Sequence, residues 1–249
     1  MRLIPLFTAY AFLVFRPSTA ADDTTALRAL VDKAIEAHGG AAKLVRYTAA
    51  TWEAKGKLFI LGRTTEYEGP FAEQLPKRQW FDVRFDTLGR QYRLTGAVSG
   101  DTQWLTTNGE KEQMSPAEFA EERERMHADW VATLRPLLDR SIPLAPAGET
   151  KIDGRTAVGI VVEMKGHRPV KVFFDKEKGL LLKSEFRERD VETGRESTRE
   201  EFYGGHREFA GLMYHTRTKT RKDGQPYSES ERSNIKPMRH LDDSLFLPR

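Results

Sequence analysis

The chain has 249 residues, with 40 lysines and arginines against 37 aspartates and glutamates, and it contains no cysteine. The lack of cysteine excludes disulfides, thiolate catalysis and cysteine-ligated metal sites. Acidic and basic residues interleave along the chain, whereas nucleic-acid-binding proteins usually concentrate basic residues in a patch. We therefore expect no nucleic-acid partner.

The first twenty residues have the plan of a secretory signal peptide. Arg2 gives a positive start, residues 3–15 are apolar, and PSTAA offers a small-residue cleavage site after Ala20. This apolar stretch is shorter than the roughly 20 residues that a helix needs to cross a bilayer. We expect residues 1–20 to be removed and residues 21–249 to form a single domain in the exported compartment. The alternative is an uncleaved anchor.

A helix is predicted over residues 24–38, where apolar side chains recur at helical spacing and Gly39-Gly40 supplies a stop. Strands are predicted from Tyr47 onward. In residues 47–60, Trp52, Ala54 and Leu58 share one face, and residues 78–86 alternate in the same way. Further strands follow to residue 114, and Asn108-Gly109 is a strong hairpin signal.

A second helix is predicted to begin after Ser115. Ser115 and Glu118 match a capping box, and Pro116 suits the first helical position. Apolar residues from Met126 to Leu138 form its stripe, and Pro136 is expected to kink or end it. The proline-rich stretch near 142–148 is the expected connection between two halves, and strands resume after Asp153-Gly154. This order predicts an α+β fold, mostly antiparallel β, with helices on one side of the sheet.

The hairpin KVFFDKEKGLLLKSEF, residues 171–186, is apolar on both faces near its turn. Successive strand side chains point to opposite faces, so Phe173 and Phe174 are separated, as are neighbouring leucines. We expect one face to pack conventionally and the other to face a covered hollow.

No enzyme motif is present. The six histidines lack metal-ligand spacing, and no nucleophile elbow, P-loop or dinucleotide fingerprint occurs. Adjacent acids such as Glu200-Glu201 should point to opposite faces of a strand, which makes them poor acid/base partners. We expect no catalysis, no metal and no cofactor.

A curved antiparallel sheet under two amphipathic helices can enclose an apolar cavity for a ligand. Its lining is predicted from the apolar residues on strands and helices. The candidates are Trp52, Leu58, Phe81, Val83, Phe85, Trp104, Trp130, Leu134, Val172, Phe174, Leu180 and Leu182.

Four segments resemble the LolA/LolB-like lipoprotein-carrier superfamily, in particular its outer-membrane lipoprotein-sorting-like branch. They are ALVDKAIEAHGGAAKL, KVFFDKEKGLLLKSEF, EFYGGHREFAGLMYHTRTKTRKDG and the ending LDDSLFLPR. The resemblance implies an incomplete, highly curved β-barrel with a lid of helices over a hydrophobic cavity. It also implies a polar latch between a strand arginine and the lid, for which Arg63 and Arg84 are candidates by position.

The function implied by this resemblance is that of a monomeric periplasmic protein that holds the acyl chain of a lipoprotein or lipid. Its expected partners are that cargo and membrane-associated donor and acceptor proteins. The alternative is an envelope sensor or protein-interaction module of the same fold with a filled cavity. A hydrolase hidden in the cavity is a third hypothesis, to be tested on lipid and ester substrates.

Overall fold

The computed structural model describes residues 20–60, 62–87 and 89–248, with side chains from Thr24 onward. The expected signal peptide therefore lies outside the described residues, apart from the backbone of Ala20. Three α-helices and two short 3-10 helices occur in the described part: α1 Ala20–Ala37, α2 Ala41–Arg46, α3 Pro116–Ala132, η1 Pro136–Leu138 and η2 Asp243–Phe246. None of the described helices combines the length and apolarity needed to cross a membrane.

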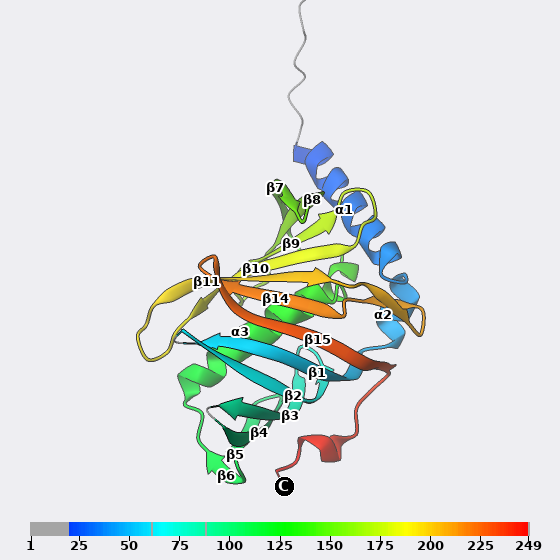
Figure 1. Ribbon diagram of the computed structural model, residues 1–249. Helices are drawn as coiled ribbons and strands as arrows, with labels where there is room; N and C mark the ends of the chain where they lie inside the picture. The colour runs from blue at the N-terminus through cyan, green and yellow to red at the C-terminus, as the bar shows by residue number, and fades with distance from the viewer. Residues whose placement is uncertain (1–19, 61, 88, 249) are drawn as a thin grey trace, which may run out of the picture.

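One antiparallel sheet of thirteen strands dominates the described part of the chain (Figure 1). Its order is β6-β5-β4-β3-β2-β1-β15-β14-β11-β10-β9-β8-β7. The strands are β1 Ala49–Ile60, β2 Arg63–Gln74, β3 Arg78–Thr87, β4 Arg90–Ser99, β5 Thr102–Thr107, β6 Glu110–Glu112, β7 Leu144–Ile152, β8 Arg155–Val162, β9 Val170–Asp175, β10 Leu181–Arg189, β11 Glu196–Gly204, β14 Arg217–Lys222 and β15 Gln225–Met238. A separate hairpin is formed by β12 Arg207–Phe209 and β13 Leu212–Tyr214.

The first and last strands meet in the middle of the sheet, because β1 pairs with β15. The sheet edges are β6 and β7, which do not pair with each other in the described structure, so the sheet stays open. Helix α3 joins these two edges and crosses one face of the sheet (Figure 1). We call that face inner and the opposite face outer. The predicted α+β class, with an open antiparallel sheet under helices, is confirmed.

Helix α3 begins and ends as its sequence predicts. Ser115 accepts a hydrogen bond from the Glu118 backbone N–H, and the Glu118 carboxylate accepts one from Ser115 N–H at 2.7 Å. Beyond Ala132 the backbone turns at Leu134, whose φ of 64° is left-handed, and Pro136 starts η1. The capping box fixes one end of the helix, and the left-handed residue prevents its continuation at the other.

Two strands occupy segments where the sequence suggested none. Strand β2 was not predicted because Gly69-Pro70 reads as a break. Pro70 can lie inside this interior strand because it pairs with Glu53 of β1, while no β2–β3 pair is formed between Glu68 and Phe71. The missing backbone N–H of proline therefore breaks no β2–β3 ladder bond. The proline-rich connection near 142–148 forms edge strand β7, with a bulge between Pro146 and Gly148. An edge strand tolerates proline because one side of it needs no ladder hydrogen bonds.

The hairpin β9–β10 is apolar on both faces, and β10 has a bulge between Leu181 and Lys183. Phe174 and Leu181 face inward and belong to the core cluster with α1 and α3 residues. Phe173 and Leu182 face outward, where the Phe173 ring lies across Gly159 and the Lys183 ammonium stands 5.2 Å from its centroid. The outer face is packed as expected, and on the inner face Leu181 borders a cavity of about 110 Å³ while Phe174 is fully buried in the core.

Candidate functional site

A cavity of about 110 Å³ lies between the inner face of the sheet and the elements that cover it. Four parts of the chain enclose it: the sheet, the C-terminal end of α3, the α1–α2 junction and the hairpin β12–β13. Its lining consists of His38, Leu44, Thr48, Ala49, Ala50, Trp52, Glu73, Leu75, Asp129, Ala132, Thr133, Arg135, Leu181, Glu201, Tyr203, Leu212, Met213, Tyr214, His215 and Arg232. The cavity therefore combines apolar walls with several charged groups.

Two of these charged groups are held by close partners. Glu201, which is 8% exposed, accepts hydrogen bonds from Arg199 Nε at 2.9 Å and from the Tyr203 hydroxyl at 3.1 Å. Although burial favours the neutral acid, these partners hold the pKa of Glu201 below its usual value. Arg135 donates to the backbone carbonyls of Leu44 and Tyr47, and thereby ties the end of α3 to the end of α2.

Asp129 of α3 and Glu73 of β2 are less well satisfied. Burial raises the pKa of Asp129 well above its usual value, and the nearby carboxylates of Glu201 and Glu73 raise it further. Burial also raises the pKa of Glu73, which Arg232 opposes. The only hydrogen bond to the Glu73 side chain from a described residue comes from Gln79 and is long, at 3.5 Å.

Two histidines hydrogen-bond the backbone of Leu181, which pairs with Phe174 next to the bulge. His38 donates its Nδ1–H to Ala34 O at 2.8 Å, so its Nε2 accepts the Leu181 N–H at 3.4 Å. His206 Nε2 donates to Leu181 O at 2.9 Å. The acceptor role of His38 requires a neutral ring, and burial lowers the pKa of His38 to about 4. Burial, followed by the charge of Arg232, also lowers the pKa of His215 well below its usual value.

An aromatic strip leads from the cavity along the inner face. Trp52 lines the cavity and stacks on Phe71, with ring centroids 5.8 Å apart and planes 3° apart. Phe71 in turn contacts Phe81, with centroids 6.3 Å apart. Phe71 and Phe81 are both half-buried. The strip therefore offers partly accessible apolar surface next to a polar cavity.

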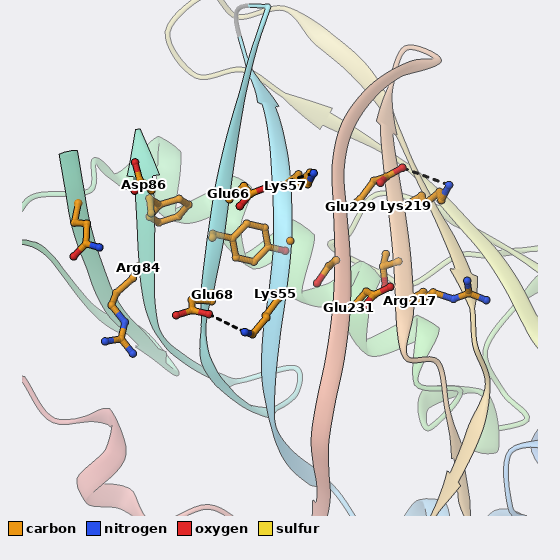
Figure 2. A pocket seen from close by; sticks show the side chains of 16 residues that line it. Lys55, Lys57, Glu66, Glu68, Arg84, Asp86, Arg217, Lys219, Glu229 and Glu231 are labelled. Carbon is orange, nitrogen blue, oxygen red and sulfur yellow. Dashed lines mark ion pairs between the residues drawn. The ribbon is translucent and has the colours of Figure 1, made fainter. Parts of the chain in front are cut away.

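The larger hollow, about 590 Å³, lies on the outer face (Figure 2). Two rows of charged residues cross strands β3, β2, β1, β15 and β14 there, one at each side of the hollow. The first row is Arg84, Glu68, Lys55, Glu231 and Arg217, and the second is Asp86, Glu66, Lys57, Glu229 and Lys219.

Charge alternates along most of each row. Lys55 pairs with Glu68 at 3.1 Å, and Lys219 pairs with Glu229 at 3.4 Å (Figure 2). Exposed cross-strand pairs of this kind contribute little individually. We interpret this face as a solvated surface whose charges satisfy one another.

Solved structures share this arrangement of sheet and helices. The chain superposes on a DUF1329 family protein from Desulfovibrio piger with a TM-score of 0.54 and 13% sequence identity, covering 88% of this chain and 96% of that chain. It superposes on a LolA superfamily protein from Nitrosomonas europaea with a TM-score of 0.53 and 12% identity, covering 89% and 97%. The fold is LolA-like. No protein-family model matches the sequence, and no curated protein does.

The LolA-like sheet places the predicted lining residues in several environments. Trp52 lines the cavity, and Leu58, Phe81, Val83 and Phe85 lie on the same inner face. Trp130 packs on Leu75 and Met126. The remaining inner candidates fill the core rather than the cavity: Leu134, Val172 and Phe174.

Two predicted lining residues lie on the outer face, and a third precedes β10. Trp104 packs under the C-terminal segment, where its Nε1–H donates to Phe246 O at 2.8 Å. Leu182 faces outward because the bulge shifts the alternation by one residue. Leu180 is half-buried in the turn. Of the latch candidates, Arg84 lies on the outer face and Arg63 is exposed at the start of β2.

The polar residues of the cavity were missed by sequence reasoning. Glu73, Asp129, Glu201 and Arg232 are far apart along the chain, and each resembles a solvated surface charge. Phe71 carried a usable signal, since Tyr67, Gly69 and Phe71 alternate with polar residues, but Gly69-Pro70 obscured it. Within the described residues, no group of three potential ligands is arranged to hold a metal ion.

Proposed function

We propose that this protein is a non-catalytic binding protein of the bacterial periplasm that holds an acyl-bearing amphiphile between its sheet and α3. The observation that carries this proposal is the continuity of the cavity with the aromatic strip, in which buried Trp52 is followed by half-buried Phe71 and Phe81. A polar cavity next to an apolar strip suits a ligand with a polar end and a hydrocarbon chain. The LolA-like fold and the signal-like residues 1–20 support the envelope setting.

Ligand uptake would require movement of α3. The cavity, at about 110 Å³, is smaller than the roughly 300–1,000 Å³ typical of ligand pockets. Polar contacts hold the helix to its surroundings. Arg168 donates to Glu121 of α3 at 2.5 and 2.7 Å, and Arg135 bonds the end of α2. If α3 lifts, water can replace these polar contacts at little cost. The apolar surface that α3 would uncover is costly in water, and a bound ligand would cover it.

On this proposal the cargo is a lipid or the acyl end of a lipoprotein, and membrane-associated donor and acceptor proteins supply and receive it. The protein acts as a monomer after loss of residues 1–20. No reaction, metal or cofactor is part of the proposal.

A second candidate is an envelope sensor or protein-interaction module. It is favoured by the filled inner core beneath α1 and α3, where Phe174, Leu134 and Val172 are fully buried. In that case the cavity would stay closed and a protein partner would dock outside it.

The two candidates differ in what the purified protein carries. Mass spectrometry of an organic extract should detect acyl lipids that co-purify with the protein. A fluorescent fatty acid should bind, and Phe71→Ala should weaken binding several-fold because it interrupts the strip. Phe202→Ala is the matched control, since Phe202 is also half-buried but lies on the outer face. Protein free of lipid that takes up no probe, yet captures a protein from envelope extract, would favour the second candidate.

A further inference from the structure

The charged groups around the cavity can be divided into those with partners and those without. Glu201 is bound by Arg199 and Tyr203, and Arg135 is bound by backbone carbonyls. Asp129 makes no hydrogen bond or ion pair through its carboxylate with any described residue. The Arg232 guanidinium likewise makes none, although it lies over the Trp52 ring, 4.5 Å from the centroid.

An unpaired acid and an unpaired base that line one cavity without pairing with each other are costly to keep. A charge removed from bulk water is destabilising unless a partner replaces the lost hydration. Asp129 can lower this cost by taking up a proton, which agrees with its raised pKa. Arg232 cannot, because a guanidinium stays protonated in proteins. A ligand that replaces water at such groups must supply equivalent hydrogen bonds or charges.

We infer that the cavity recognises the zwitterionic end of an amphiphile, with its ammonium group toward Asp129 and Glu73 and its anionic group toward Arg232. This inference rests on the proposed function and specifies its ligand class. The hydrocarbon chain leaves the cavity along Phe71 and Phe81. The small volume suits a head group rather than a chain.

Ligands with one kind of charge fit less well. A purely anionic head would satisfy Arg232 but would lie among the carboxylates of Asp129, Glu73 and Glu201. A purely cationic head would satisfy the carboxylates but leave Arg232 without a partner and add a second positive charge near it. A zwitterion offers an ammonium group to the carboxylates and an anionic group to Arg232.

The test compares three probes with the same 14-carbon chain: lysophosphatidylethanolamine, lysophosphatidylglycerol and a primary alkylamine. Binding is followed below the micellar concentration by calorimetry and by tryptophan fluorescence, since Trp52 lines the cavity. The zwitterionic probe should bind about tenfold more tightly than either other probe, as expected when one charge-assisted contact is lost.

Two variants separate the two ends of the head group. Asp129→Asn should weaken lysophosphatidylethanolamine about tenfold and should not weaken lysophosphatidylglycerol, whose anionic head loses a repelling neighbour. Arg232→Gln should weaken both phosphate probes and should not weaken the alkylamine. Glu229→Gln on the outer face is the matched charge control and should change no affinity. Thermal unfolding of each variant shows that it is folded.

The outcomes are distinguishable. Equal binding of all three probes, unaffected by Asp129→Asn and Arg232→Gln, would overturn the head-group inference while the proposed function stands. Absence of binding to the folded wild-type protein would overturn the proposed function itself. The affinity for free phosphoethanolamine, which has the head group without the chain, is measured as a final comparison. Binding as tight as that of the lysolipid would support a zwitterion site and overturn the assignment to an amphiphile.

Discussion

His38 accepts a hydrogen bond from the backbone N–H of Leu181, which connects the end of α1 to the bulge in β10. The acceptor is Nε2, because Nδ1–H donates to Ala34 O. A protonated ring would carry a hydrogen on both nitrogens and could not accept this bond. The contact between the helix and the sheet therefore depends on a neutral imidazole.

The free energy of unfolding should fall as the pH is lowered from about 6.5 to about 4. The imidazole of the unfolded chain binds a proton near pH 6.5, whereas burial lowers the pKa of His38 to about 4. The unfolded state thus binds more protons in this window, and acid favours it. The shift is worth up to about 3 kcal/mol.

Urea unfolding of wild type and His38→Gln across this range measures the effect. The variant should lose less stability than wild type between about pH 6.5 and 4. The difference between the two proteins isolates His38 from His127, whose pKa burial also lowers to about 4. Parallel stability profiles would contradict the prediction.

Glu121 should contribute more to stability than a neighbouring surface charge on the same helix. It accepts two hydrogen bonds from the Arg168 guanidinium and one from the Arg189 backbone N–H at 2.9 Å. Glu121→Gln should lower the free energy of unfolding by about 1–3 kcal/mol. Arg123→Ala removes the exposed pair with Asp101 and should cost less than about 0.5 kcal/mol. Denaturant unfolding of both variants tests this order, and equal costs would refute it.

Gly39→Ala should disturb the junction between α1 and the hairpin β12–β13. Gly39 has a φ of 109°, and an added Cβ would stand 2.3 Å from the carbonyl oxygen of Gly211. Gly166 is the matched control, with a φ of 87° and open space where a Cβ would lie. Gly166→Ala should cost about 1–2 kcal/mol through its backbone conformation alone, and Gly39→Ala about 1–3 kcal/mol more. A smaller loss for Gly39→Ala in thermal unfolding would show that the junction is not closely packed.

Reversing one charge in the outer rows should destabilise the sheet in a salt-dependent way. Glu229 lies between Lys57 and Lys219, so Glu229→Lys places three cations side by side. We expect a loss of about 0.5–1 kcal/mol at low ionic strength that shrinks in high salt. Glu192→Lys makes the same change in net charge in an exposed turn and should have little effect. A salt-independent loss would point to packing rather than charge.

Much of the fold follows from local sequence patterns. The capping box at Ser115 and Glu118 places the start of α3, and alternation places Trp52 and Phe81 on one face. The expectation that adjacent acids diverge is confirmed. Glu200 pairs with Lys183 on the outer face, whereas Glu201 pairs with Arg199 on the inner face.

The remaining features depend on contacts between distant segments. The bulge beyond Leu181 changes which leucine faces the core, and no local pattern marks it. Pro70 lies inside a central strand because the neighbouring ladder leaves a gap there. The polar cavity unites Glu73, Asp129 and Arg232 from three elements, and only the sheet order brings them together.

The covalent route of α3 constrains how this protein can move. The helix is connected to β6 at one edge of the sheet by residues 113–115 and to β7 at the other edge by residues 133–143, which include η1. Both ends of α3 are thus tied to opposite edges of one sheet. We therefore expect any lifting of the helix to be coupled to a change in the curvature of the sheet.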